Sequence, residues 1–261
     1  MRQLAWMAGL WAWALLAWAA PAAVPVHVFT TAYPPYAAPD LPGQGAAVRM
    51  LREILEPRGF SPRIDFQPWA RLGAELAARR YDLVLLAWPG DLQRHGLVGG
   101  APWFVSRLGL YVRREDWRAA GLTLAEAAGR HVGIVRDYAY PRLLYDNDLV
   151  LEVATSDAQN LRKLQAGRID AVALERAVGQ FLLGHADAGL DVGALVWQEP
   201  AFAVVPIHAA VVPGRPLSTR LIRALADGLR AYRQDGRYAR LLHDEDLDAP
   251  ADAGRPGFSR P

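Results

Sequence analysis

Two residue types are almost missing from this sequence of 261 residues, which has no cysteine and a single lysine, Lys163. Without cysteine the chain cannot form disulfides, bind zinc or an iron–sulfur cluster through thiolates, or use a thiol as a nucleophile. An N-terminal cysteine carrying a lipid is absent too, so we expect no lipoprotein. Lys163 lies outside any Gly-Lys-Ser/Thr motif, which excludes a phosphate-binding loop.

The charges of the chain nearly cancel. There are 29 basic and 27 acidic residues, a formal net charge of +2, and 52% of the residues are hydrophobic. The sequence pI of about 9.0 therefore rests on a small surplus, and no basic cluster accompanies it. We expect no nucleic acid partner. The hydrophobic fraction excludes a disordered chain, and the length fits one large domain or two small ones.

The first 23 residues have the pattern of a secretory signal peptide. Met1 and Arg2 precede an uncharged apolar run, residues 4–20, and A-x-A sites stand at its end. An uncleaved transmembrane anchor is the alternative, since the run reaches the lower edge of a spanning length. We expect cleavage between Ala19 and Ala23 and a periplasmic protein. Removing Arg2 leaves 28 basic and 27 acidic residues.

The rest of the chain alternates between strand-like and helix-like segments. Strands are expected at 24–30, 64–66 and 82–87, and helices at 46–58 and 72–79, the first ending at Gly59. Such alternation is typical of a parallel sheet covered by helices. The sequence therefore predicts an α/β fold.

One helix–turn–strand unit occurs twice. Five residues recur 88 positions later: Leu76, Ala78, Arg80, Asp82 and Val84 match Leu164, Ala166, Arg168, Asp170 and Val172. A chance match is the alternative, but residues 132–135 also give the second half an opening strand. We expect one lobe at 24–110, a second at 111–202, and a return to the first at 203–243, with a strand at 203–212 and a helix at 217–232. Residues 244–261 are expected to be a flexible tail.

Signatures of catalysis are weak. The six histidines are scattered without metal-ligand spacing, and no serine stands in a Gly-x-Ser-x-Gly motif. Gly43-Gln44-Gly45 follows no strand and lacks a third glycine, so it indicates a turn before a helix rather than a dinucleotide site. We expect neither a cofactor nor a metal, and no enzyme.

Candidate binding residues follow the expected strands, because ligands of open parallel sheets bind beyond the carboxyl ends. These ends single out residues 30–36, 87–89 and 136–140 and Glu175. Tyr33 and Trp69 are aromatic residues on expected loops, where they contact a ligand or simply pack on the lobe. Arg94, also on an expected loop, has the fork that holds a carboxylate, although most arginines are solvated surface charges.

Two further candidates belong to the second half. Glu175 ends an apolar strand, where it pairs with a ligand ammonium or with a nearby arginine. Arg136, Asp137 and Tyr138 lie between an expected strand and an expected helix start, where free backbone N–H groups can receive an anion.

These residues resemble the type 3 periplasmic solute-binding proteins, the amino-acid-binding receptors of ABC importers. The resemblance spans nearly the whole chain after the leader. It rests on these segments, in this order: Tyr33-Pro34-Pro35-Tyr36, Pro68-Trp69-Ala70-Arg71, Arg80-Tyr81-Asp82, Gln93-Arg94, Ala101-Pro102-Trp103, 124–135, Ala166-Gly167-Arg168-Ile169-Asp170 and Asp235-Gly236-Arg237-Tyr238. It implies a two-lobed periplasmic binding protein fold of type II, each lobe a mostly parallel sheet flanked by helices, with two crossing hinge strands.

The resemblance also implies roles for single residues. Tyr33 corresponds to the ring that covers the ligand, and Trp69 to an apolar contact. Arg94 corresponds to the arginine that binds the α-carboxylate, Glu175 to the acid that receives the α-ammonium, and Tyr138 to the second-lobe segment that also contacts the carboxylate.

This sequence departs from the family pattern at several of its binding positions. The small or hydroxyl residues expected before the arginine are Ala87 and Pro89 here, and Ala139 replaces a hydroxyl in the second lobe. The helix that follows Gly45 begins without its usual acids. Fewer donors for a carboxylate count against an ordinary α-amino acid.

The function we expect is capture of a small polar solute, an amino acid or a related carboxylate, for ABC import. The partners would be that ligand and an inner-membrane permease, with the chain a monomer. An enzyme similar to the periplasmic cyclohexadienyl dehydratases, with Glu175 as its acid, is one alternative. A ligand sensor for a membrane partner is the other.

Overall fold

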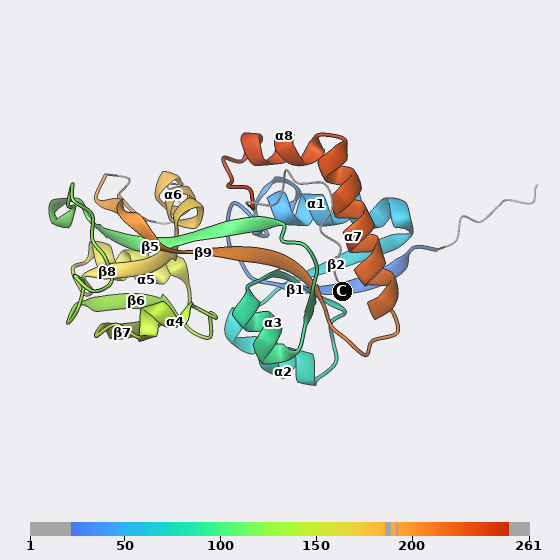
Figure 1. The fold of residues 1–261 in the computed structure, drawn as a ribbon, viewed down its shortest axis with the longest axis horizontal. Coiled ribbons are helices and arrows are strands. Elements are labelled where there is room, and N and C mark those ends of the chain that lie inside the picture. Colours follow the sequence, from blue (N-terminus) through green and yellow to red (C-terminus); the bar gives the residue numbers. More distant parts are fainter. Residues whose placement is uncertain (1–21, 186–188, 192, 251–261) are drawn as a thin grey trace, which may run out of the picture.

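The computed structural model describes residues 22–185, 189–191 and 193–250, which form two lobes joined by a pair of long strands (Figure 1). The expected signal peptide at 1–23 therefore lies outside the described residues except for its last two positions. Within the part of the chain that is described, no helix combines the length and apolarity that crossing a membrane would need.

The first lobe is built around a parallel sheet. Strand β1 (Val24–Thr30) pairs with β2 (Phe60–Phe66) on one side and with β3 (Leu83–Ala87) on the other. The short strand β4 (Val98–Gly99) pairs with the end of β9 (Leu195–Val211), which also pairs with β3. The helices of this lobe are α1 (Ala46–Leu55), α2 (Leu72–Ala77), α3 (Pro89–His95), α7 (Ser218–Gln234) and α8 (Arg237–Asp244).

The second lobe repeats this plan with fewer helices. Its parallel strands are β6 (His131–Val135), β7 (Val150–Ala154) and β8 (Ala171–Glu175), with β6 in the middle. Its helices are α4 (Arg142–Tyr145), α5 (Asp157–Gln165) and α6 (Arg176–Gly184). The α/β class and the two-lobed architecture expected from the sequence are confirmed.

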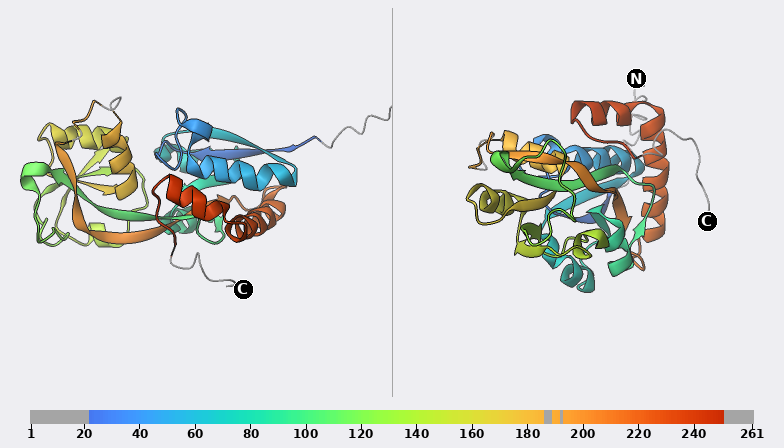
Figure 2. Two further views of the ribbon diagram at one scale, coloured as in Figure 1. Left: turned by 90° about the horizontal axis from the view of Figure 1, so that it is seen from above. Right: turned by 60° about the vertical axis from the view of Figure 1, so that its left-hand side comes forward.

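Two antiparallel strands connect the lobes. Strand β5 (Phe104–Arg113) and strand β9 pair along most of their length. Strand β5 also pairs with β8 in the second lobe, and β9 also pairs with β3 in the first lobe. Figure 2 shows the lobes at opposite ends of this pair. The lobe boundaries that we expect after residues 110 and 202 fall inside these two strands. Their pairing shifts register between Leu108 and Leu110.

The sequence repeat has a structural counterpart in each lobe. The carboxylate of Asp82 accepts a 3.0 Å hydrogen bond from the backbone N–H of His27, and that of Asp170 accepts a 2.9 Å bond from His131. Both aspartates directly precede a strand and anchor it to the first strand of their lobe. The aspartate of the Arg-x-Asp sequence thus has the same structural role in both lobes.

Several segments differ from the expectation. Strand β2 begins at Phe60 rather than at residue 64, because Pro62 is tolerated on a strand at the edge of the sheet. Strand β9 begins at Leu195 rather than at residue 203 and runs through Pro200 and Pro206. Arg94, expected in a loop, lies within α3, whose first residue is a proline.

The last long helix returns to the first lobe. Along α7, Leu221, Leu225 and Leu229 are buried, and the helix packs against α1. Gly228 permits this approach, since a Cβ there would lie 2.2 Å from Ile54. After α8 the chain continues along the lobe, with Leu247 buried, and residues 251–261 lie outside the described part.

Candidate functional site

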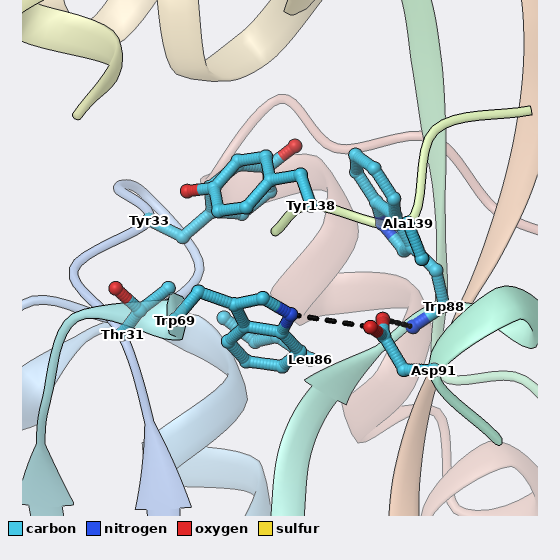
Figure 3. A pocket seen from close by; sticks show the side chains of 8 residues that line it. All are labelled: Thr31, Tyr33, Trp69, Leu86, Trp88, Asp91, Tyr138 and Ala139. Atoms are coloured by element: carbon cyan, nitrogen blue, oxygen red, sulfur yellow. Dashed lines mark hydrogen bonds between the residues drawn. The ribbon is translucent and has the colours of Figure 1, made fainter. Parts of the chain in front are cut away.

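A pocket of about 260 Å³ lies where the two lobes face each other (Figure 3). The first lobe contributes residues from the loop after β1, from the start of the helical turn after β2, and from the end of β3 into α3. The second lobe contributes the turn after β6. The lining residues are Thr31, Tyr33, Trp69, Leu86, Trp88, Asp91, Tyr138 and Ala139.

Four aromatic rings form most of the wall. The ring of Tyr138 stands edge-to-face against those of Tyr33, Trp69 and Trp88, with centroid distances of 6.1, 6.4 and 5.7 Å. Tyr33 and Trp88 also meet edge-to-face at 6.4 Å. Tyr138 thus reaches from the second lobe into a bowl of three first-lobe rings, a contact that exists only while the lobes are together.

Asp91 is the acid of the pocket. The residue is 1% exposed. It lies in the first turn of α3, the helix that begins at Pro89. One carboxylate oxygen accepts a 3.2 Å hydrogen bond from the indole N–H of Trp69, and the other accepts a 2.9 Å bond from the backbone N–H of Trp88. Burial raises the pKa of Asp91 to about 6, against these bonds and the charge of Arg94, which act the other way.

A second buried acid holds Tyr138. The Tyr138 hydroxyl donates a 3.2 Å hydrogen bond to Asp157, which opens α5. Burial raises the pKa of Asp157 to about 7. The turn that carries Tyr138 passes through Asp137, whose φ of 62° lies in the left-handed region that favours glycine. The tyrosine is therefore fixed at both ends, by a strained turn and by a buried hydrogen bond.

The backbone of the first lobe is also unusual at the pocket. Leu86 has a φ of 71°, which leucine rarely adopts, and the pairing of β3 with β9 is irregular at this point. The bulge aims the end of β3 so that both Leu86 and Trp88 face the pocket. Such strain persists only where the surrounding packing enforces it, and it concentrates at binding sites.

Three of the predicted site residues meet in this pocket and three do not. Tyr33, Trp69 and Tyr138 line it, whereas Ala87 is buried at the end of β3 opposite His208. Arg94 lies one turn further along α3 than Asp91, is exposed, and donates a 3.1 Å hydrogen bond to the backbone oxygen of Asp137. Its guanidinium therefore joins the lobes outside the pocket.

Glu175 caps a helix instead of lining the pocket. Its carboxylate accepts a 2.7 Å hydrogen bond from the N–H of Val178 at the start of α6, and a 3.5 Å bond from the Tyr36 hydroxyl. It is 2% exposed, and burial raises its pKa to about 7. The carboxylate is thus occupied by the N-terminus of the next helix and by a tyrosine of the other lobe.

Two of the three backbone N–H groups of the turn at 136–138 already have hydrogen-bond partners. The N–H of Arg136 donates to the oxygen of Ala154, at 2.9 Å, and that of Tyr138 donates to the oxygen of Val135, at 3.4 Å. No helix begins directly there, since α4 starts at Arg142. The pairing with β7 and the turn itself thus use two of the three N–H groups of this segment, and an anion site there stays a prediction.

Thr31 and Trp88 lie in the segments 30–36 and 87–89 that the expected strand ends indicated, whereas sequence reasoning missed Leu86 and Asp91 as lining residues. Leu86 belongs to β3 itself, and Asp91 lies four residues past the end of that strand, within α3. The position close to the carboxyl end of a parallel strand was the signal that could have found Asp91. Among the described residues, no group of three or more histidines, cysteines, aspartates or glutamates is placed to hold a metal ion.

Comparison with solved structures identifies the architecture. The sensor domain of a histidine kinase with similarity to periplasmic binding proteins matches with 25% identity, over 87% of this chain and 98% of that one, at a TM-score of 0.73. The substrate-binding protein of an amino acid ABC transporter matches with 17% identity, over 84% and 98%, at a TM-score of 0.70. The chain has the periplasmic binding protein fold.

A third structure with this fold extends the range of relatives. An ancestral amino-acid-binding protein, a precursor of cyclohexadienyl dehydratase, matches with 18% identity, over 84% of this chain and 94% of that one, at a TM-score of 0.66. No protein-family model and no curated protein matches the sequence. The resemblance to the solute-binding receptors stated from the sequence is confirmed at the level of this fold.

Proposed function

We propose that this chain is a periplasmic receptor that captures a small polar solute between two closing lobes and delivers it to an ABC importer. One observation carries the proposal: the aromatic pocket takes its lining from both lobes, with Tyr33, Trp69, Trp88 and Asp91 on one side and Tyr138 on the other. A ligand held there contacts both lobes at once and therefore favours the closed arrangement over an open one.

The rest of the molecule suits such closure. Among the named strands, only β5 and β9 join the lobes. Two paired strands of this kind can act as a hinge, because a change of conformation at a few of their residues moves one lobe relative to the other. The ligand would dock on Trp69 and Trp88, and Tyr138 would then cover it. The space inside the pocket, about 260 Å³ including the part open to solvent, leaves room only for a small molecule.

The amino acid expected from the sequence has less support than the receptor role. Arg94 and Glu175, which would bind its carboxylate and its ammonium, both lie outside the lining. The dehydratase alternative depends on Glu175 as the acid and loses its support for the same reason. We therefore favour a binding protein over an enzyme.

Sensing is the second candidate function. The sensor domain of a histidine kinase is a structural neighbour at 25% identity and is covered almost completely by this chain. In that role the closed lobes would act on a membrane partner without releasing solute to a permease. Uptake of labelled ligand in cells with and without the chain distinguishes the two: import predicts lost uptake, and sensing predicts unchanged uptake with an altered response.

Binding itself is tested with the chain from residue 23 onward. We expect at least one compound from a panel of amino acids, polyamines, organic acids and small ammonium compounds to raise the melting temperature. The same compound should change tryptophan fluorescence, since Trp69 and Trp88 line the pocket, and should reduce the radius of gyration in X-ray scattering. A binder that leaves both fluorescence and radius unchanged argues against capture between the lobes.

A further inference from the structure

The lining of the interlobe pocket is negatively charged and aromatic. Asp91 is its one charged side chain among the residues that line it, and no arginine, lysine or histidine belongs to this lining. A ligand carboxylate placed there would lie beside the Asp91 carboxylate without a cation to neutralise it. Like charges in a buried site repel strongly, so the charges of the lining residues exclude an anionic ligand and favour a cation.

The four rings favour a cation independently of Asp91. Aromatic faces carry a negative quadrupole and attract a positive group within about 6 Å of the centroid, indole rings most strongly. Two of the four rings are the indoles of Trp69 and Trp88, and Tyr138 from the second lobe completes the enclosure when the lobes meet. A cation surrounded in this way contacts both lobes and needs few hydrogen bonds.

The hydrogen-bonding groups of the pocket decide which kind of cation fits. The hydroxyl of Tyr138 donates to Asp157, and that of Tyr33 lies 3.4 Å from Ser106, so both are engaged away from the pocket. Asp91 already accepts from Trp69 and Trp88. A guanidinium or a primary ammonium would bring several N–H donors to a wall with few free acceptors, and each unsatisfied donor is costly. An alkylated ammonium has no such need.

We propose that the pocket binds the alkylated ammonium group of a small organic cation, with Asp91 as counter-ion and Trp69, Trp88, Tyr33 and Tyr138 as the surrounding rings. This inference rests on the proposed receptor function and specifies its ligand class. The remainder of the ligand extends toward Thr31 and Ala139, the small lining residues. The ligand's recognition is thus by charge and ring faces, not by an arginine–carboxylate pair.

The decisive experiment compares choline with 3,3-dimethylbutan-1-ol, its uncharged analogue of nearly the same shape, by isothermal titration calorimetry at pH 7.5 on the chain from residue 23 onward. We expect choline to bind at least tenfold more tightly than the alcohol. L-Glutamate and acetate, which carry carboxylates, should show no binding at the same concentrations. Equal affinity for choline and the alcohol would overturn the assignment of a cation site.

Variants then test the named residues. Asp91→Asn keeps an oxygen for the Trp88 or Trp69 N–H and removes the charge, so choline affinity should fall at least tenfold while that of the alcohol stays within twofold. Asp40→Asn, at an exposed loop position, is the matched control and should bind like the parent chain. Melting curves establish that each variant is folded. An Asp91→Asn chain with parent affinity for choline contradicts the proposal.

Position 88 separates ring faces from mere apolar contact. Trp88→Phe retains an aromatic face and Trp88→Leu does not, although both variants keep the wall of the pocket apolar. Choline affinity should therefore decrease in the order Trp, Phe, Leu at this position. Affinity for the alcohol should not follow that order. If amino acids or organic acids bind and choline does not, the receptor proposal stands and the cation proposal falls. If no compound of any class binds, the receptor proposal itself fails.

Discussion

The indole N–H of Trp69 donates a 3.2 Å hydrogen bond to the carboxylate of Asp91, two residues that come from different helical segments and face the same pocket. The bond fixes the ring of Trp69 and the orientation of the acid together (Figure 3). A change in the charge of Asp91 therefore alters both the electrostatics of the pocket and the position of an aromatic wall.

Binding of an organic cation should weaken in acid. Burial raises the pKa of Asp91 to about 6, and burial also holds the pKa of Tyr138, which faces it from the second lobe, well above its usual range. The charge of Arg94 on the same helix favours the ionised form of Asp91. Protonation removes the counter-ion, so choline affinity should fall about tenfold between pH 7.5 and pH 5. Calorimetry at several pH values measures this. A pH-independent affinity would place the cation away from Asp91.

Stability without ligand should change in the opposite direction. Asp91, Asp157 and Glu175 have pKa values raised to about 6, 7 and 7, so the folded state takes up protons that the unfolded chain binds only near pH 4. Folding therefore becomes more favourable as the pH falls from 8 to 5. Burial lowers the pKa of His95, so this single histidine makes folding less favourable as the pH falls and opposes the effect of the three acids. Urea denaturation at pH 5, 6, 7 and 8 measures the trend.

The variant Asp157→Asn checks the source of that trend. It removes one of the three buried carboxyls, and the gain in unfolding free energy between pH 8 and pH 5 should shrink. Asp227→Asn, at an exposed position with a surface ion pair, should leave the gain unchanged. Stability that decreases steadily from pH 8 to pH 5 in the parent chain would contradict the assignment.

Substitution Gly90→Ala should hinder closure. Gly90 lies in the first turn of α3, and a Cβ there would come within 2.8 Å of the Cβ of Ala139 in the other lobe. Ligand affinity should fall by about tenfold, since about 1.4 kcal/mol of hindrance suffices for that. Gly184→Ala, at the end of α6 with no atom nearby, is the matched control. A radius of gyration that contracts normally with ligand in Gly90→Ala would refute the steric argument.

Arg94 should act as a link between the lobes, not as a ligand contact. Its bond to the backbone oxygen of Asp137 is exposed, and such a bond contributes about 1 kcal/mol or less. Arg94→Ala should therefore weaken an uncharged ligand by about fivefold at most. A carboxylate ligand should lose little more than that, because Arg94 lies outside the lining. Arg230→Ala, which removes an exposed arginine from α7, is the control. A loss confined to carboxylate ligands would restore the role that the sequence resemblance implied.

The repeated aspartates offer a test of the fold itself. Asp82 is buried and also pairs with Arg215 at 3.2 Å, whereas Asp170 is more exposed and lies 3.9 Å from Arg113. Asp82→Asn should cost about 2 kcal/mol of unfolding free energy, and Asp170→Asn less than half of that. Chemical denaturation of both variants measures the difference. Equal losses would show that burial of the ion pair is irrelevant here.

Much of the fold could be predicted from local pattern. Apolar strands alternating with helices, and the Arg-x-Asp unit before two of the strands, placed most elements within a few residues. Proline accounts for two of the errors. Pro62 masked half of β2, because the sequence does not reveal that β2 lies at an edge, and Pro200 masked the first half of β9. Strand β5 contains no proline, and the local pattern did not place it.

The candidate site was harder to predict because side-chain direction depends on the neighbouring turn. Tyr33, Trp69 and Tyr138 follow strands and reach the pocket. Glu175 is the last residue of a strand, but a helix starts directly after it and its first turn binds the carboxylate. Arg94 is turned away because α3 begins at Pro89, which gives the pocket to Asp91 instead. These outcomes depend on where short helices begin, which composition does not fix.

The two connecting strands also determine the order in which the lobes are completed during synthesis. The second lobe has all its strands once the first half of β9 has been made. The first lobe lacks the strand between β3 and β5 until the second half of β9 follows, and it lacks the cover of α7 until residue 234. The lobe that begins the chain is therefore the last to be finished. A chain that stops before that point carries an exposed β3 edge, which makes the C-terminal quarter a requirement for a first lobe that does not aggregate.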